Sequence, residues 1–221
     1  MRTTPTPAKA PEVSRRGEAD TLEAGCAQLG VSLPPGAVQR MSAYLDLLEK
    51  WNRAYNLTAI RRREDMVVRH LLDSLAVLPL LKGRRFLDVG SGAGLPGIPL
   101  AICLPEWEFV LLDSNGKKTR FLFQASLALA LDNIRVVDSR VESYRPEKYF
   151  DGVLSRAFAS LPQMVTLCGR LVDRGQALYA MKGSVPQGEA AVLLDAGIQV
   201  DVDVLEVPGL DEQRSLVTIY P

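Results

Sequence analysis

The chain of 221 residues has one histidine, His70, and three cysteines, and its 26 Lys and Arg are balanced by 26 Asp and Glu. A single histidine excludes an HExxH zinc site. Cys26, Cys103 and Cys168 lie far apart and are odd in number, which fits neither a disulfide framework nor a zinc site. We therefore expect buried free thiols and no metal. The absence of net charge argues against indiscriminate binding of nucleic acid.

Long apolar runs are also missing. No stretch of about 18 apolar residues exists, so no segment is expected to span a bilayer. Residues 1–20 mix Pro, Thr, Ala, Arg and Glu without the apolar stretch of a secretory signal. A soluble, monomeric protein of the cytoplasm with no membrane contact is expected. Its length and its 47% of hydrophobic residues suffice for the core of one compact domain.

The first third of the chain has helical periodicity. Residues 1–18 lack a hydrophobic pattern and are expected to form a flexible tail. Apolar residues recur at helical spacing over residues 19–30, from Val38 to Trp51, and over residues 63–81. Residues 19–82 are therefore predicted to form an N-terminal helical cap.

Beyond Gly83, short apolar runs alternate with helical stretches. This alternation is typical of βαβ units around a parallel sheet. Strands are predicted at 86–89, 109–112, 134–137, 152–154 and 177–181, and helices at 98–104, 117–131, 161–172 and 186–194. Two last strands, 200–207 and 216–219, leave no room for a helix between them and must pair antiparallel. Residues 83–221 are thus predicted as an α/β domain with a mostly parallel, seven-stranded sheet and an antiparallel terminal strand.

A glycine-rich loop follows the first predicted strand, with glycines at positions 90, 92, 94 and 97. Glycines let the backbone turn sharply and approach a ligand, and ligands of open α/β sheets bind at the carboxyl ends of strands. Asp113 ends the next strand, where it is placed to accept hydrogen bonds from a ribose. Together these residues indicate a nucleoside-containing cofactor.

Two cofactors fit this loop. Residues 92–97 match the GxGxxG fingerprint of dinucleotides, whereas residues 88–94 match the acidic-Gly-x-Gly-x-Gly pattern of S-adenosylmethionine enzymes, which begins directly after the strand. The Asp88 carboxylate would repel a pyrophosphate and attract the ammonium group of a methionine moiety. S-adenosylmethionine is favoured, and an NAD(P)-dependent oxidoreductase is the alternative. With the antiparallel hairpin, the pattern resembles the Rossmann-like fold of class I S-adenosylmethionine-dependent methyltransferases.

Absent motifs bear on the methyl acceptor. Residues 154–158 read LSRAF where enzymes that methylate exocyclic base amines usually carry Asn/Asp-Pro-Pro-Tyr/Phe, and no cysteine has the setting of a cytosine C5 nucleophile. Acceptors with a free lone pair, such as a purine N7, remain, as do oxygen acceptors that need a base. An N7 acceptor loses no proton before transfer, so alignment would dominate catalysis. No catalytic residue is assigned.

Charge is unevenly distributed along the chain. From Arg40 to Arg85, ten basic residues outnumber five acidic ones, for a net charge of +5; from Pro186 onward, one Arg stands against seven acids, for a net charge of −6. Basic residues interleaved with aromatic and Asn side chains near Trp51 suit phosphate contact and base stacking on RNA. Trp51 itself is expected in the core. His70 and Asp73 are expected to share a hydrogen bond on one helix face.

Seven ordered motifs resemble the bacterial small-subunit rRNA guanine-N7 methyltransferase family RsmG, also called GidB. They are WNRAYNLT at 51–58, RHLLDS at 69–74, the glycine loop at 90–99, LDS at 112–114, SRVE at 139–142, SRAFAS at 155–160 and MKG at 181–183. The resemblance extends from about Leu45 to the C-terminus. It implies S-adenosylmethionine-dependent methylation of a guanine N7 in 16S rRNA, with the rRNA or a small-subunit particle as partner.

The resemblance also implies site residues. At matching positions it assigns cofactor contacts to Gly90, Leu95, Val141, Glu142 and Arg156. The loop argument adds three more expected cofactor residues, namely Gly92, Gly94 and Asp113.

Contacts with RNA are expected elsewhere. An arginine paired with guanine O6 and N7 would occupy the lone pair to be methylated, so Arg156 is expected at the cofactor or a phosphate. Arg53, Arg69, His70 and Lys182 are the expected rRNA contacts. The alternative from a different class of function is a non-catalytic RNA-binding module on the same fold.

Overall fold

The computed structural model describes residues 15–184 and 187–221. Residues 1–14 of the predicted tail, which was expected over 1–18, and the predicted helix start at Pro186 lie outside the described residues. Helix α1 begins at Arg15, four residues before the predicted start at Ala19, so residues 15–18 are helical rather than part of a tail. The reason is a long-range contact, because Glu18 is buried and pairs with Arg63.

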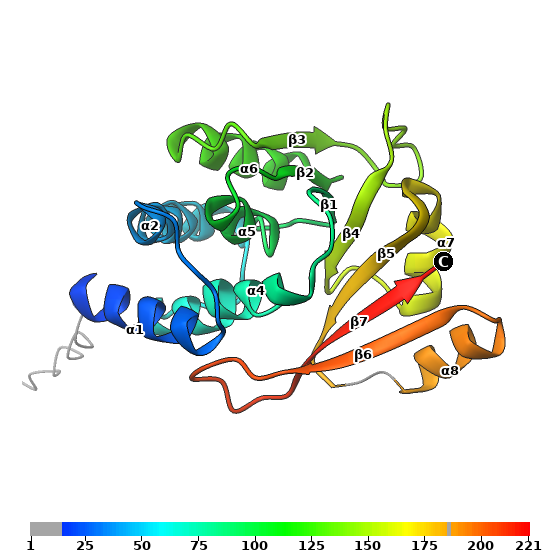
Figure 1. The fold of residues 1–221 in the computed structure, drawn as a ribbon. Coiled ribbons are helices and arrows are strands. Elements are labelled where there is room, and N and C mark those ends of the chain that lie inside the picture. Colours follow the sequence, from blue (N-terminus) through cyan, green and yellow to red (C-terminus); the bar gives the residue numbers. More distant parts are fainter. Residues whose placement is uncertain (1–14, 185–186) are drawn as a thin grey trace, which may run out of the picture.

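A seven-stranded sheet forms the centre of the fold, in the order β3-β2-β1-β4-β5-β7-β6 (Figure 1). The strands are β1 Arg85–Val89, β2 Glu108–Asp113, β3 Ile134–Asp138, β4 Phe150–Arg156, β5 Val172–Lys182, β6 Gln199–Leu205 and β7 Arg214–Tyr220. The pairs from β3 through β5 are parallel, whereas β7 lies antiparallel between β5 and β6. The predicted seven-stranded sheet with an antiparallel terminal strand is confirmed.

Helices cover both faces of this sheet. They are α1 Arg15–Gln28, α2 Ala37–Tyr55, α3 Arg63–Met66, the π-helix η1 Val67–Leu72, α4 Asp73–Leu75, the 3-10 helix η2 Leu78–Leu80, α5 Gly97–Cys103, α6 Gly116–Ala128, α7 Leu161–Cys168, the 3-10 helix η3 Gly169–Leu171 and α8 Gln187–Asp195. Helices α2, α5 and α6 lie on one side, and α7 and α8 on the other (Figure 1).

Two buried clusters follow from the alternation of side chains along each strand. In β1, Phe86 packs with the apolar faces of α2, α5 and α6, whereas Leu87 packs with those of α7 and α8. Leu22 of α1 and Met41 of α2 belong to the same cluster as Phe86. The helical cap therefore shares one core with the sheet.

Two predicted helices end or change earlier than expected. The helix predicted over residues 63–81 is interrupted by the π-helix η1, in which the N–H of Asp73 donates to the carbonyl of Val68, five residues back. The helix predicted over residues 161–172 ends at Cys168, and Val172 already begins β5. A π-turn adds a residue per turn, so it changes which side chains share a face.

The three thiols are free and buried, as expected. Burial raises the pKa of Cys103 and of Cys168 to about 12, so both are protonated and inert near neutral pH. Among the described residues, no group of three His, Cys, Asp or Glu side chains is placed to hold a metal ion. No helix within 15–184 or 187–221 combines the length and apolar character needed to cross a membrane.

Candidate functional site

The glycine loop joins β1 to α5 at the carboxyl end of the sheet. Gly90, Gly92 and Gly94 have φ angles of 71°, 57° and 88°, in the left-handed region that side chains strain. At Gly94 a Cβ atom would lie 2.3 Å from the Cδ1 of Ile98. The loop therefore needs these glycines to follow its path beside the end of β2, where the N–H of Gly90 donates to the carbonyl of Leu112 over 2.8 Å.

Asp113 at the end of β2 is tied to this loop. Its Oδ2 accepts the N–H of Gly92 over 3.0 Å, and its Oδ1 accepts the N–H of Asn115 over 2.9 Å. The Nζ of Lys118, in the first turn of α6, lies 3.8 Å from Oδ2. The side chain is 7% exposed, so backbone contacts orient the carboxylate before any ligand arrives.

A cavity of about 380 Å³ opens beside Asp113 and the glycine loop, and we call it the glycine-loop cavity. Its lining residues are Val89, Gly90, Leu112, Asp113, Ser114, Lys118, Ser139, Arg140, Val141, Glu142, Ala157, Phe158, Ala159, Gln163 and Leu167. The structure thus brings together four expected cofactor residues, namely Gly90, Asp113, Val141 and Glu142. This volume is that of a small-molecule site.

The other four expected cofactor residues do not line this cavity. Gly92 donates its N–H to the carboxylate of Asp113, which does line the cavity. Gly94 faces Ile98, and Leu95 is buried in the core under the helices. Arg156 lines a separate cavity, described below.

Asp88 is enclosed, so it cannot make the contact with a methionine ammonium group that the sequence predicted. Because side chains alternate along β1, Asp88 faces α5, where its Oδ2 accepts the N–H of Gly97 over 3.0 Å. Its Oδ1 has no hydrogen-bond partner among the described residues. Burial raises the pKa of this carboxyl to about 7. On this geometry, Asp88 organises the start of α5 and does not contact a ligand in the glycine-loop cavity.

The helical cap reaches the glycine loop through Tyr44 of α2. This side chain is completely buried, and its hydroxyl donates to the carbonyl of Ala93 over 2.8 Å. Burial raises the pKa of Tyr44 well above its usual range, so the phenol stays protonated and remains a donor. The cap therefore supports the loop directly.

A second cavity, of about 320 Å³, adjoins the first, and Ala157 lines both. We call it the arginine cavity. Its lining residues are Asp73, Arg156, Ala157, Met181, Lys182, Gly183, Leu205, Arg214 and Ser215. Its lining carries three cationic side chains and one carboxylate, a composition that favours an anionic group.

Asp73 links two arginines in this cavity. Its Oδ1 lies 3.1 Å from the Nε of Arg214, and its Oδ2 lies 3.2 Å from the Nη2 of Arg156. The same Nη2 donates to the carbonyl of Arg69 over 2.9 Å. Burial raises the pKa of Asp73, and both guanidinium groups oppose that rise.

Two expectations for His70 are wrong. Its Nε2 lies 2.9 Å from the Oγ1 of Thr58, so its side-chain partner is Thr58 and not Asp73. The π-turn and the two arginines explain the difference, because they direct Asp73 toward β4 and β7. His70 is 3% exposed, which also excludes contact with RNA in this conformation. Burial, with the nearby charge of Arg156, lowers its pKa to about 4, so the imidazole is neutral.

The other expected RNA contacts lie in three different settings. Arg53 is exposed near the end of α2, and no ion pair is recorded for it within the described chain. Both terminal nitrogens of Arg69 bind the exposed carboxylate of Glu212 over 2.8 and 2.7 Å. Lys182 donates to the carbonyl of Ala159 over 2.9 Å and lines the arginine cavity. The structure does not gather these residues into one cluster.

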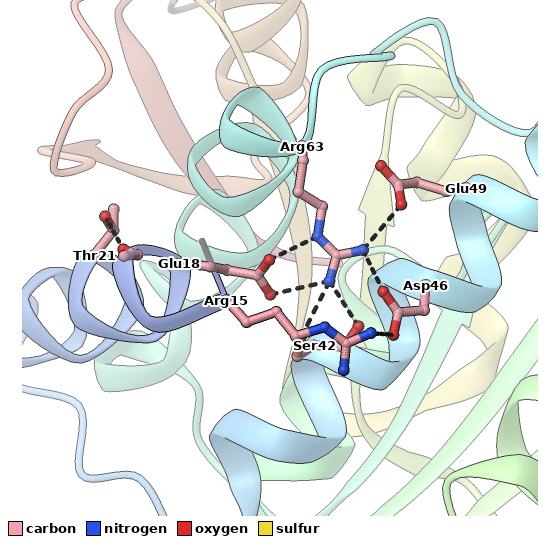
Figure 2. Close-up of polar contacts among 8 residues, drawn as sticks. Arg15, Glu18, Thr21, Ser42, Asp46, Glu49 and Arg63 are labelled. Carbon is pink, nitrogen blue, oxygen red and sulfur yellow. Dashed lines mark hydrogen bonds and ion pairs between the residues drawn. The ribbon is translucent and has the colours of Figure 1, made fainter. Parts of the chain in front are cut away.

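Part of the positive charge of the cap forms ion pairs within the protein. Figure 2 shows Arg63 surrounded by acidic side chains of α1 and α2. It pairs with Glu18 over 2.7 Å, with Asp46 over 2.9 Å and with Glu49 over 3.1 Å. The net charge of +5 for residues 40–85 already counts Asp46 and Glu49, so of these three carboxylates only Glu18 offsets a further unit of that charge.

Several cavity residues had no role in the expectations. Ser114 and Lys118 follow Asp113 within five residues, and Arg140 directly precedes Val141. Closeness to a predicted site residue was therefore the signal that the sequence offered for these three. Arg214 has no such neighbour. Its only signal is that it is the single Arg in the acidic C-terminal stretch.

Known proteins resemble this chain over most of its length. The family described as GidB, rRNA small subunit methyltransferase G, matches residues 37–217. A ribosomal RNA small subunit methyltransferase G from Nitrosococcus oceani is 54% identical over 200 residues, which cover 90% of this chain and 94% of that protein. The protein of the same name from Salmonella agona is 52% identical over 193 residues, covering 87% of this chain and 93% of its own.

Solved structures share the fold at low sequence identity. A SAM dependent methyltransferase from Aquifex aeolicus has a TM-score of 0.58 at 18% identity, covering 75% of this chain and 97% of its own. The glycopeptide N-methyltransferase MtfA, complexed with S-adenosylmethionine, has a TM-score of 0.58 at 9% identity, covering 69% and 87%. The predicted class I methyltransferase fold is confirmed, and the extent of the sequence matches shows that the chain belongs to the GidB family, rRNA small subunit methyltransferase G.

Proposed function

We propose that the chain transfers a methyl group from S-adenosylmethionine to the N7 atom of a guanine in 16S rRNA. The observation that carries the proposal is the pair of adjoining cavities at the carboxyl end of the sheet. One has the glycine loop and a pre-oriented Asp113, and the other has cationic walls. Membership of an rRNA small subunit methyltransferase family supports both the chemistry and the RNA class.

The glycine-loop cavity fits S-adenosylmethionine by the chemistry of its donors and acceptors. Asp113 has lone pairs left for the ribose hydroxyls after accepting two backbone N–H groups. Val141 and Glu142 supply an apolar and a polar wall for the adenine side. Gly90 lets the backbone approach closely. When bound, S-adenosylmethionine supplies an electrophilic methyl group on a sulfonium.

The residues of the chain then act by holding and orienting the acceptor. Guanine N7 has an available lone pair, so no group has to remove a proton before transfer. Holding the two reactants in line is worth roughly 7–11 kcal/mol in favourable cases. Ala157, which lines both cavities, lies where the acceptor and the cofactor would meet.

RNA is held by cations around the second cavity. Arg156 faces that cavity and is tied to Asp73, a position suited to a phosphate and not to the N7 edge of the base. Lys182 lines the same cavity, and Arg53 offers charge on the surface of the cap, whereas Arg69 would first have to exchange Glu212 for a phosphate. Phosphate contacts of this kind set the register of the RNA, and contacts to the base select it.

The direct test is methyl transfer. The protein is incubated with labelled S-adenosylmethionine and with either 16S rRNA or small subunits from cells that lack this modification, and the nucleosides are then separated. Label in 7-methylguanosine is expected from at least one substrate. Label in another nucleoside overturns the proposal.

Bound cofactor with no transfer to rRNA or subunits favours the non-catalytic RNA-binding module. A melting-temperature increase with NAD(P) and none with S-adenosylmethionine favours the oxidoreductase alternative.

A further inference from the structure

The buried carboxylate of Asp73 lies where three distant segments meet. Asp73 begins α4, Arg156 ends β4 and Arg214 begins β7. The side chain of Asp73 is 2% exposed, against 24% for Arg156 and 18% for Arg214. Each carboxylate oxygen pairs with a different guanidinium, so the two arginines are held beside each other on the wall of the arginine cavity.

The arginines keep donors that the protein does not use. The Nη1 of Arg156 is enclosed and has no hydrogen-bond partner among the described residues, although its Nη2 is bound twice. A guanidinium has five N–H donors, and its fork matches a phosphate in geometry. An unsatisfied buried donor is unfavourable, and an acceptor that completes it must reach an atom now shielded from solvent.

The charges of this wall do not cancel. Arg156, Arg214 and Lys182 line the cavity with Asp73 as the only carboxylate of the lining. Glu212 and Glu189 also pair with Arg214 and Lys182, but from outside the lining, with 51% and 38% of their side chains exposed. Solvent screens these outer pairs more strongly than the buried one. The cavity therefore has an excess of positive charge for an anion.

We propose that Asp73 is a positioning residue that holds Arg156 and Arg214 together as a phosphate-binding pair for the acceptor RNA. This inference rests on the proposed function and assigns a role to a residue that itself touches neither RNA nor cofactor. Without the carboxylate, the two guanidinium groups repel each other and separate, so the phosphate loses a pre-organised partner.

Asp73→Asn distinguishes this role from bulk electrostatics. The substitution removes one negative charge, so charge alone predicts tighter RNA binding. The positioning role predicts the opposite, with KM for rRNA or small subunits about tenfold higher or more, as expected when a buried charge pair loses one partner. Affinity for S-adenosylmethionine, measured by calorimetry, is expected to remain at the wild-type value, because Asp73 does not line the glycine-loop cavity.

Glu18→Gln provides a matched control. Glu18 is also a buried carboxylate bound to an arginine, with 7% of its side chain exposed, and it lines neither cavity at the carboxyl end of the sheet (Figure 2). It is expected to lower the melting temperature without changing KM for the RNA. An Asp73→Asn variant whose KM falls, or changes no more than that of Glu18→Gln, overturns the inference.

A second variant keeps the test valid if Asp73→Asn does not fold at the assay temperature. Arg214→Lys keeps the charge but loses the planar fork and its fixed contact with Asp73, so the same rise in KM is expected. A wild-type KM for this variant also overturns the inference. A wild-type protein that transfers no methyl group to guanine N7 contradicts the proposed function instead, which separates the two failures.

Discussion

Tyr44→Phe removes the oxygen atom that makes the only side-chain hydrogen bond from the described part of the cap to the glycine loop. In the wild type the hydroxyl donates to the carbonyl of Ala93 over 2.8 Å, and both residues are buried. No other hydrogen bond to that carbonyl is recorded within the described chain. The variant therefore leaves a buried carbonyl without its partner.

The expected cost follows from this geometry. An unsatisfied buried acceptor costs about 1–3 kcal/mol, while the change in side-chain volume is small. For a chain of this size, each kcal/mol lowers the melting temperature by about 2–4 °C. If the freed loop must be ordered again when the cofactor binds, the same free energy limits the loss of affinity to about 5- to 150-fold.

Two measurements and one control test this reasoning. Chemical denaturation gives the free energy of unfolding, and calorimetry gives the Kd of S-adenosylmethionine. Tyr179→Phe is the control, because Tyr179 is also buried and its hydroxyl accepts the N–H of Lys82 over 3.3 Å, away from the loop. It is expected to lose stability and to keep the wild-type Kd.

The reasoning is refuted if Tyr44→Phe binds S-adenosylmethionine as tightly as Tyr179→Phe does. In that case the hydroxyl would stabilise the fold without supporting the loop in its binding conformation. A free energy of unfolding equal to that of the wild type would refute the assigned hydrogen bond itself.

Three further changes probe the cavity and the loop. Asp113→Ala should weaken S-adenosylmethionine binding at least about tenfold, since charged hydrogen bonds contribute about 1.5–3 kcal/mol; an unchanged calorimetric Kd contradicts its ribose role. Burial raises the pKa of Asp88 to about 7, above its unfolded value, so wild-type stability falls as pH rises toward 7. The free energy of unfolding of Asp88→Asn should therefore rise by about 2–3 kcal/mol relative to that of the wild type from pH 5 to pH 7. A difference that denaturation curves show to be independent of pH refutes this. Gly94→Ala should cost about 2 kcal/mol or more because of its positive φ and the clash with Ile98, while Gly188→Ala, in open space on α8, should be neutral or stabilising; equal melting temperatures contradict the packing argument.

Local patterns were sufficient for the sheet and the loop. Short apolar runs alternating with helices predicted the first five strands, and the hairpin at the end of the chain predicted the last two, although the edge strands β3 and β6 are only partly buried. The glycine loop was also recognisable, since a left-handed backbone at Gly90, Gly92 and Gly94 needs that residue type wherever the chain folds.

Contacts between distant residues were not predictable from local patterns. Arg63 reads as a surface charge, yet it is fixed by three carboxylates from α1 and α2. His70 and Asp73 are three positions apart, which suits a pair on an α-helix, but the π-turn and two remote arginines give each a different partner. Partners that lie 12 to 141 residues apart leave no periodic trace in the sequence.

The candidate site was predicted in part for the same reason. The positions of Gly90 and Asp113 follow from the ends of two adjacent strands, so the motif indicated them. Strand alternation places Asp88 on the same face of β1 as Phe86, where it points toward α5. The prediction of a ligand contact relied on charge complementarity and did not take this alternation into account. Arg214 reaches the site from β7, and its position there follows from the antiparallel insertion of that strand into the sheet.

The place of β7 in the sheet has a consequence for biosynthesis. The ribosome makes β6 before β7, yet among the described strands β6 pairs only with β7, and β7 pairs with β5. Until residues 214–220 leave the exit tunnel, β5 presents an open row of backbone donors and acceptors, and β6 has no strand to join. Unpaired edges of this kind template association with other chains. A nascent chain stalled between β6 and β7 thus exposes the edge of β5 to association with other chains.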